Sequence, residues 1–303
     1  MIAAIAVLLW LFVREIDWHS LGRAVEGAKL WPLVLAAALN FGCLWGKAAC
    51  WRIMLAPRYV VRITRLFRIT IAAFAGSVIA PARAGEVLRV WSLKRRDGVA
   101  VADSAAVAVA EKLLDGMTML LLVAPAPFLL ELPRWVSTAI VATAAIALAA
   151  FVALYIAVGR SGPSPASWLA RFIAGMHVIR SPKRLAQSFA VLILVWLLDL
   201  AMVMLVLHAV GVAQPVAAGL FILFAINLTI ALPSTPAAVG AFEVGALAAL
   251  DVLGVPRADA LAFALLYHAL QVVPLIAAGL ALEMRLVLGR EPAPRDSELA
   301  AQP

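Results

Sequence analysis

The sequence has few charged residues for its length. Only 14% of its 303 residues are charged, whereas 65% are hydrophobic and the mean hydropathy is +1.02. A soluble domain of this size could not cover so much apolar surface, so the composition indicates an integral membrane protein. No segment is long and polar enough to form a second, soluble domain. We expect one polytopic membrane domain over residues 1–290 and a disordered cytoplasmic tail over residues 291–303.

Several hallmarks of soluble enzymes are absent. The chain has two cysteines, Cys43 and Cys50, which a helix would separate by roughly 10 Å, too far for a disulfide. We therefore expect buried free thiols. The four histidines show no H-E-x-x-H or other paired metal spacing, and there is no P-loop, nucleophile elbow or dinucleotide fingerprint. We expect no enzyme activity, no metal and no cofactor.

Positive charge gathers in a few segments between apolar stretches. The net charge is +8, which in a soluble protein would suggest nucleic acid as a partner. Here it indicates cytoplasmic loops that face anionic lipid headgroups. The segment from Lys47 to Arg68 contains six basic residues and no acid, and that from Arg83 to Arg96 contains five against Glu86. We expect both segments to be cytoplasmic.

Apolar segments of two lengths occur along the chain. We predict six full spans, at Ile2–Val13, Leu30–Ala48, Val99–Leu130, Val136–Val158, Leu185–Val210 and Asp259–Leu282. The first is short, but it lacks a basic n-region and a clear cleavage site, so we interpret it as a transmembrane helix rather than a signal peptide. Two further apolar segments, Ile69–Ala80 and Ala217–Leu232, are shorter than the roughly 20 residues that a span requires.

The short segment Ile69–Ala80 has segments of expected cytoplasmic location on both sides. It therefore cannot cross, and we interpret residues 69–90 as a re-entrant hairpin that enters the membrane and turns back. Ala217–Leu232 follows an uncharged loop and is interpreted as a second re-entrant arm that enters from outside. The last span then ends inside, beside Arg285 and Arg290, and both termini are cytoplasmic.

The two halves of the chain resemble each other at an offset of 156 residues. Residues 98–115 and 254–271 share Gly, Val, Ala, Asp and two further alanines. Upstream, three residues have counterparts in the second half: Pro81, Gly85 and Glu86 match Pro236, Gly240 and Glu243. The loop charges place the two halves in opposite orientations, which predicts an inverted repeat with halves at roughly 30–130 and 185–285. In such folds the discontinuous segments meet near the midplane and form the substrate site.

The predicted fold is thus an all-α integral membrane protein with about six full transmembrane helices and two re-entrant helical hairpins. Four motifs carry a resemblance to a known family: PARAGEVLR, AEKLLD, LPSTPAAVGAFE and GVPRADALAFALLYHALQ. They are similar to the lysylphosphatidylglycerol synthase transmembrane-region family, which is flippase-like, over roughly Leu30 to Arg285. Ala82 and Ala237 stand where that family commonly has glycine, and LLYHALQ resembles members associated with hopanoid biosynthesis.

The resemblance implies translocation of lipids or lipid-linked molecules. Some relatives carry an aminoacyl-transferring domain after the membrane region. This sequence ends at Pro303, so we expect no synthase activity.

The first candidate site is the tip of the first hairpin. Arg83 lies in the Pro81–Gly85 turn, where free amides at a helix start and an arginine suit a phosphate, and Glu86 and Arg89 are spaced to pair. The alternative is an interfacial turn that extends its charges into water.

A second candidate cluster is formed by Glu111, Lys112 and Asp115. Glu111 lies about 18 Å from the start of its predicted helix, well inside the hydrocarbon layer. Charges at that depth are costly and by default mark a substrate pathway or a proton relay. The alternative is a neutralised structural cluster that holds the spans together. Asp199 and Asn227 are further intramembrane polar residues and weaker candidates.

The second half supplies repeat equivalents of this cluster, Tyr267, His268 and Gln271. We expect them to face the same cavity, where His268 could titrate near neutral pH, although a plain hydrogen-bonding role is the alternative. Glu243 lies two turns inside a helix that starts near Ser234, and we expect it to meet an arginine or lysine from the first half.

A membrane-surface segment is predicted before the first hairpin. Arg58, Arg62 and Arg65 fall on one face of a helix whose other side is apolar, as is typical of an amphipathic helix lying on the cytoplasmic surface. The expected partners of this segment are anionic lipids.

These patterns favour a flippase or transporter in the bacterial inner (cytoplasmic) membrane. Its substrate would be a polar-headed or anionic lipid such as a phospholipid, aminoacyl-lipid, hopanoid or lipid-linked sugar. Two alternatives stay open. One is a membrane-embedded transferase with Glu111 or Asp115 as a base, and the other is a non-transporting partner of a lipid-synthesis enzyme. A transferase would consume a donor, whereas a flippase would only redistribute lipid. The expected partners are membrane lipids and no nucleic acid.

Overall fold

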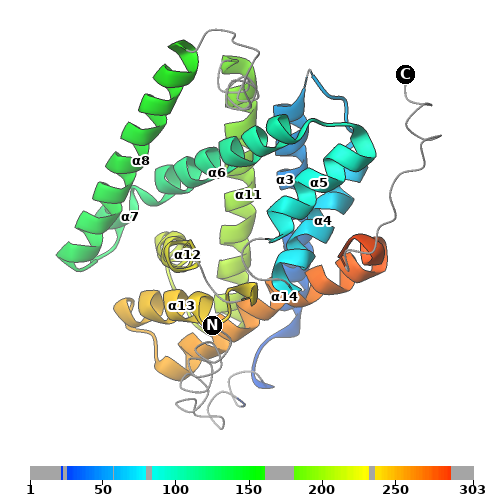
Figure 1. The fold of residues 1–303 in the computed structure, drawn as a ribbon. Helices are drawn as coiled ribbons and strands as arrows, with labels where there is room; N and C mark the ends of the chain where they lie inside the picture. Colours follow the sequence, from blue (N-terminus) through cyan, green and yellow to red (C-terminus); the bar gives the residue numbers. More distant parts are fainter. Residues whose placement is uncertain are drawn as a thin grey trace, which may run out of the picture. The chain divides into compact units, whose positions relative to one another are not determined.

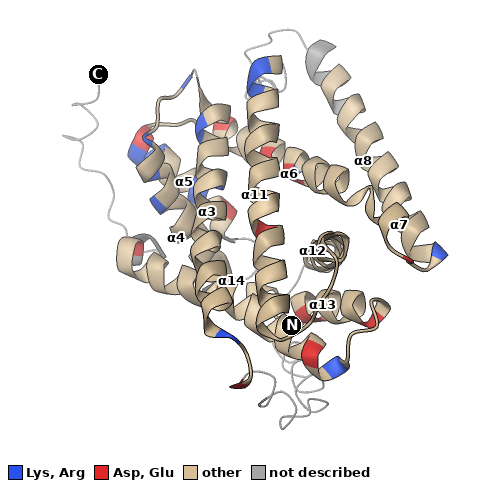
Figure 2. Ribbon diagram, turned by 180° about the vertical axis from the view of Figure 1, so that it is seen from behind, with Lys and Arg blue, Asp and Glu red and all other residues tan. Residues whose placement is uncertain are grey.

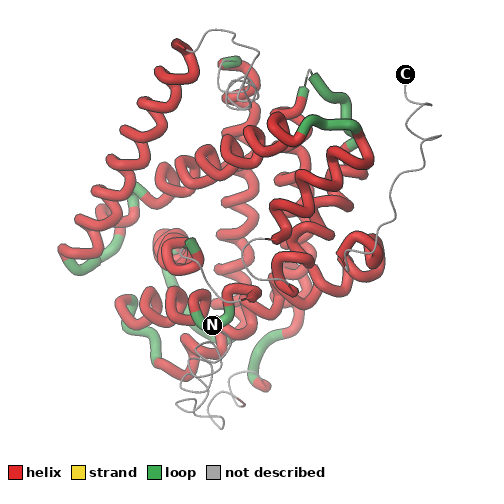
Figure 3. The backbone as a smooth tube through the Cα atoms, viewed as in Figure 1, coloured by secondary structure: helices red, strands yellow, loops and turns green. Residues whose placement is uncertain are grey.

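The computed structural model describes residues 22, 26–56, 58–79, 84–160, 181–231 and 236–287. Figure 1 shows their elements: α3 (Leu30–Leu55), α4 (Ile63–Ile79), α5 (Ala84–Asp97), α6 (Val101–Val123), α7 (Ala126–Leu129), α8 (Arg134–Arg160), α11 (Pro182–Ala209), α12 (Val216–Ile230), the 3₁₀ turn η1 (Pro236–Ala238), α13 (Ala241–Val252) and α14 (Arg257–Val287). No strand occurs in these ranges (Figure 3), so the prediction of an all-α fold is confirmed for them. The predicted first span and the tail lie outside the described residues.

Four helices are long and apolar enough to cross a membrane. They are α3, α8, α11 and α14, and they match four of the predicted spans. Figure 2 shows how sparse charged residues are along α8 and α11. Large apolar side chains of α8 lie exposed, among them Val141 and Ile146, at 54% and 70%. Water would solvate such a surface poorly, whereas lipid tails solvate it well.

The prediction of one continuous span over Val99–Leu130 is wrong. Helix α6 ends at Val123, and the short helix α7 begins after Pro125. The physical reason is Pro125, because proline has no N–H to continue the hydrogen-bond ladder of α6. With 23 residues α6 is long enough to cross, but it carries four charged residues and is not among the four apolar helices.

The chain forms two compact units, each with its own core. Unit 1 draws its described residues from Met1–Cys43, Gly116–Ala149 and Ile193–Pro274, and unit 2 from Leu44–Asp115, Ala150–Leu192 and Leu275–Pro303. The core of unit 1 is rich in aromatic residues from α12, α13 and α14, whereas Trp51, Met54 and Leu66 are central to the core of unit 2.

Each unit contains a hairpin of two shorter helices. In unit 2, α4 packs against α5, and in unit 1, α12 packs against α13 (Figure 1). Gly85 of α5 lies so close to α4 that a Cβ would collide with the carbonyl of Ala73 and the hydroxyl of Ser77. Gly245 of α13 also lies close to α12, because an added Cβ would be 2.7 Å from the Cα of Ile226. Both hairpins therefore depend on a glycine where their arms meet.

The close packing at Gly85 predicts a strong effect of a single methyl group. We expect Gly85→Ala to lower the free energy of unfolding by about 1–3 kcal/mol, because the backbone of α4 must move aside. The measurement is the thermal midpoint of the purified protein in detergent, followed by tryptophan fluorescence. Gly116→Ala is the matched control: Gly116 is exposed in α6 and has no atom within 4 Å of an added Cβ. Equal midpoints for the two variants would contradict the close approach of α4 and α5.

A proline within α14 explains a polar residue in the otherwise apolar first half of α3. Because Pro274 has no N–H, the carbonyl of Leu270 loses its helical partner. Asn40 of α3 donates its Nδ2 to Leu270 O at 3.1 Å and to Gln271 O at 3.2 Å. Asn40 therefore satisfies backbone groups that hydrocarbon would leave unpaired.

Candidate functional site

The predicted anion site at the first hairpin tip is described only in part. Arg83 and Pro81 lie outside the described residues, so that assignment stays a prediction. Glu86 and Arg89 lie in the first two turns of α5. In the described part of the chain their direct contacts are with other residues, Arg89 with Glu111 and Glu86 with Lys112.

Arg89 is the centre of a buried polar cluster in unit 2 and is only 4% exposed. Its Nη1 lies 3.3 Å from Glu111 Oε2, and its Nη2 donates to Thr70 Oγ1 at 2.9 Å. The guanidinium also lies over the ring of Trp51, 3.8 Å from the centroid. Its Nε is buried and has no hydrogen-bond partner among the described residues. Such an unpaired donor is rare in a protein interior and leaves Arg89 with unused binding capacity.

Glu111 connects Arg89 to residues of α3. Trp51 Nε1 donates to Glu111 Oε2 at 2.5 Å, and Lys47 Nζ lies 3.8 Å from Oε1. Lys47 also contacts Asp115 Oδ1 at 2.6 Å, one turn further along α6. Two basic and two acidic side chains therefore cancel, and buried charges persist when they are compensated in this way.

Lys47 and Trp51 are members of the cluster that the sequence analysis missed. Lys47 was expected in a cytoplasmic loop, but α3 continues to Leu55 and places it in the last third of the helix. The sequence signal was the i, i+4 spacing of Lys47 and Trp51, which puts both on one helix face. Lys112 projects from a different face of α6 and forms a half-exposed pair with Glu86, with Nζ 3.4 Å from Oε1 and side chains 50% and 41% exposed.

Unit 1 contains a second polar site, around His268. Its Nδ1 lies 2.5 Å from Glu243 Oε1, and its Nε2 lies 2.9 Å from the carbonyl of Ala237. Glu243 Oε2 accepts the N–H of Gly240 at 2.7 Å. Both oxygens of Glu243 are thus engaged by residues of its own unit, and the expected contact with an arginine or lysine of the first half stays a prediction. The His268 ring stacks on Phe242, with centroids 4.3 Å apart.

Asp199 of α11 is the acceptor for the other two residues predicted in this half. Tyr267 OH donates to Asp199 Oδ1 at 2.6 Å, and Gln271 Nε2 lies 3.5 Å from the same oxygen. The other intramembrane candidate, Asn227, donates to Leu223 O of its own helix and so has a local role. A cavity shared by the clusters of the two halves stays a prediction.

The two polar sites follow the same pattern of contacts. In each unit, one charged residue of a long helix contacts residues i and i+4 of a second long helix. Lys47 does so with Glu111 and Asp115, and Asp199 does so with Tyr267 and Gln271. The 156-residue offset matches Glu111 with Tyr267 and Asp115 with Gln271. It does not match the central residues, because Lys47 and Asp199 are 152 residues apart, and their charges are opposite in sign.

The hairpins follow the pattern as well. The second arm of each hairpin presents a glutamate to the following long helix. The partners Lys112 and His268 are matched by the 156-residue offset, whereas the glutamates Glu86 and Glu243 are 157 residues apart. The pairs are Glu86 with Lys112 and Glu243 with His268. The recurrence therefore extends from sequence identity to side-chain contacts.

The predicted amphipathic helix through Arg58, Arg62 and Arg65 is wrong. Helix α4 begins only at Ile63, and α3 has ended at Leu55. The sequence has a proline at position 57, shortly after the end of α3, and a proline has no N–H with which to extend a helix. Arg58 Nη1 contacts Asp103 Oδ1 at 2.8 Å, and Arg65 Nη1 contacts Asp97 Oδ1 at 2.6 Å. Contact of these arginines with a membrane surface stays a prediction.

The side chain beside Arg58 shares its acidic partner. Tyr59 OH donates to Asp103 Oδ2 at 2.8 Å. Burial and this hydrogen bond raise the pKa of Tyr59 above its ordinary value. The hydroxyl is therefore neutral at physiological pH and acts as a hydrogen-bond donor.

Neither cysteines nor metal ligands form a site in the described ranges. Neither Cys43 nor Cys50 of α3 forms a disulfide; Cys50 is buried, as predicted, whereas Cys43 is only partly buried. No group of three or more His, Cys, Asp or Glu side chains that could hold a metal ion occurs among the described residues.

The four helices that are long and apolar enough to cross a membrane define the class of the protein, a multi-pass membrane protein. The family model for the lysylphosphatidylglycerol synthase TM region matches residues 1–279, so the chain belongs to that family. No curated protein and no solved structure matches the chain.

Proposed function

We propose that this protein is a lipid flippase or transporter that moves a polar-headed or anionic lipid between the leaflets. The observation that carries the proposal is the buried, neutral cluster of Arg89, Glu111, Lys47 and Asp115 beside the half-exposed Glu86–Lys112 pair. Membership of the family supports it.

The chemistry of the cluster suits a headgroup that must leave water while its tails stay in lipid. Arg89 has a buried Nε without a partner in the described part of the chain, and a phosphate oxygen is a fitting acceptor for it. Glu86 and Lys112 are half-exposed, so a headgroup can reach them without displacing the core. Intramembrane ion pairs of this kind commonly mark a substrate path.

The proposed architecture is an inverted repeat with two re-entrant hairpins. Hairpin helices α4, α5, α12 and α13 have 17, 14, 15 and 12 residues, fewer than the roughly 20 that a span requires. The matched contacts of the two polar sites support the repeat. We further propose that the protein lies in the bacterial inner membrane with both termini in the cytoplasm. This part of the proposal is supported only by the positions of the basic segments.

The test is redistribution of headgroup-labelled lipids in proteoliposomes. We expect headgroup-dependent movement that slows at least about tenfold, equivalent to 1.4 kcal/mol of barrier, in Lys112→Gln and in Arg83→Ala. Lys112→Gln removes the charge and shortens the side chain by only one atom. Arg52→Gln is the matched control, because Arg52 is an exposed basic residue in the last turn of α3.

Two outcomes would overturn the proposal. The first is that a protein that remains folded moves no lipid. This result would favour a non-transporting partner of a lipid-synthesis enzyme. The second is consumption of a donor during the reaction, which would indicate a transferase. Equal rates of lipid movement in Lys112→Gln and Arg52→Gln would show that the Glu86–Lys112 pair is not part of the translocation path.

A further inference from the structure

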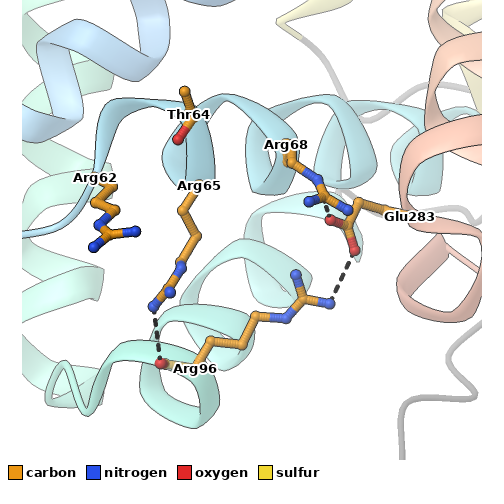
Figure 4. Close-up of a pocket in the computed structure, with 6 residues that line it drawn as sticks. All are labelled: Arg62, Thr64, Arg65, Arg68, Arg96 and Glu283. Carbon is orange, nitrogen blue, oxygen red and sulfur yellow. Dashed lines mark hydrogen bonds and ion pairs between the residues drawn. The ribbon is translucent and has the colours of Figure 1, made fainter. Parts of the chain in front are cut away.

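A cavity lined by arginines lies at the start of α4, and its residues are different from those of the buried cluster. It has a volume of about 360 Å³ and is lined by Arg62, Thr64, Arg65, Arg68, Arg96 and Glu283 (Figure 4). All six belong to unit 2. A volume in this range accommodates a small ligand or a headgroup.

The cavity carries a surplus of positive charge. Glu283 contacts Arg68 Nε at 2.8 Å and Arg96 Nη2 at 2.9 Å, so one carboxylate serves two arginines. Arg65 contacts Asp97 just outside the lining. Four arginines thus face two acids, which leaves two positive charges in excess. Arg62 forms no ion pair within the described residues.

The backbone adds to this surplus. The first helical hydrogen bond of α4 runs from Leu66 N to Arg62 O, so the preceding amides at the start of the helix have no acceptor within it. The start of a helix carries partial positive charge and favours acids, yet α4 has no acidic residue in its first turn. Arg62 and Arg65 flank it instead. Basic residues at this end of a helix are unfavourable unless an anion accompanies them.

Glu283 shows that the cavity accommodates an anion held by two guanidinium groups. Glu283 itself interrupts the helical geometry of α14, with φ −145° and ψ 41°. Arg68 Nη2 also donates to the carbonyl of Leu282 at 3.0 Å, so both Arg68 and Arg96 are held in place by this segment. Arg62 and Arg65 lie on the other side of the cavity (Figure 4). Thr64, which is between them in the sequence, also lines the cavity.

We propose that this cavity binds a phosphate-bearing anion, with Arg62 and Arg65 contacting the phosphate oxygens and Glu283 holding Arg68 and Arg96 in position. Arginine forks match phosphate oxygens, and helix amides add further donors. The phosphate belongs either to the headgroup of an anionic lipid or to a soluble phosphate compound. The proposal concerns binding and does not rest on lipid translocation.

The experiment measures binding to the full chain in a neutral detergent. The probes are phosphatidylglycerol, followed by native mass spectrometry, and inorganic phosphate, followed by calorimetry. In Arg62→Ala we expect the apparent Kd for the bound probe to rise at least about fivefold, because one charge-assisted contact is lost. Arg52→Ala is the control: it removes the same charge from another exposed arginine of unit 2, outside the cavity, and should stay within about twofold of the wild type.

The two probes distinguish the source of the phosphate. Arginine-dependent binding of phosphatidylglycerol alone supports a lipid headgroup, and arginine-dependent binding of inorganic phosphate as well supports a general phosphate site. Equal Kd values in Arg62→Ala and Arg52→Ala for both probes would overturn the proposal, as would the absence of binding by the wild type. Because Arg62 is exposed and has no ion pair in the described ranges, its replacement should leave the fold intact.

Discussion

Glu111→Gln should destabilise the protein by about 3–5 kcal/mol, the typical cost of leaving a buried charge without its partner. Arg89 and Lys47 would keep their charges against Asp115 alone, in a cluster where the side chains of Arg89 and Glu111 are only 5% and 6% exposed. The Trp51 N–H would also lose its charged acceptor. The measurement is the thermal midpoint in detergent.

Asp103→Asn is the matched control for this prediction. It removes an acid from an arginine pair that is shorter, 2.8 Å between Arg58 and Asp103 against 3.3 Å between Arg89 and Glu111. The Asp103 side chain is 14% exposed, but that of Arg58 is 42% exposed, so water can solvate the guanidinium after the loss. The asparagine oxygen can still accept from Tyr59 OH, and the expected cost is about 0–1 kcal/mol. If distance decided the outcome, Asp103→Asn would cost more, and that result would contradict the argument from burial.

A charge-restoring variant tests whether the cost is electrostatic. In Arg89→Gln/Glu111→Gln the cluster is neutral again, with Lys47 facing Asp115 at 2.6 Å. We expect the double variant to be more stable than Glu111→Gln alone, because neighbouring charges couple non-additively. A double variant that is less stable than the single one would show that packing, not charge balance, controls this site.

Composition and spacing were sufficient to predict the class of fold and the pairs of short helices. Apolar runs of about 20 residues leave few alternatives to a span, and runs such as Ile69–Ala80 are too short. The span predicted over Val99–Leu130 is divided near Pro125. The sequence did not show this division, because the apolar run continues past the end of the helix. Lys47 was misplaced for a related reason: a basic residue next to an apolar run resembles a loop residue until the rest of α3 shows its compensated partners.

The partners within the site could be predicted only in part. The comparison of the two halves matched Glu86 with Glu243 and Lys112 with His268, and the structure pairs Glu86 with Lys112 and Glu243 with His268. The comparison also matched Gly85 with Gly240, whose roles differ. Gly85 allows close approach of two helices, whereas Gly240 has a φ of 88° and precedes the start of α13. Sequence spacing identifies which residues correspond, but tertiary packing decides what each one contacts.

The same substitution that disrupts the Glu111 site should be tolerated at Glu243. The carbonyl of Ala237 can only accept, so His268 Nε2 carries a hydrogen, and the 2.5 Å contact between Nδ1 and Glu243 Oε1 requires one more proton between them. A glutamine supplies that hydrogen itself and keeps an oxygen for the N–H of Gly240. Glu243→Gln should therefore cost no more than about 1 kcal/mol.

His268→Phe is the complementary change and should cost about 3–5 kcal/mol. The phenyl ring preserves the stacking on Phe242, but Glu243 is left 3% exposed without its partner, and the carbonyl of Ala237 loses its donor. Thermal midpoints in detergent measure both variants beside Glu111→Gln. If Glu243→Gln is as unstable as His268→Phe, the pair is held by a full carboxylate charge rather than by a shared proton. If His268→Phe is as stable as the wild type, stacking alone maintains this site.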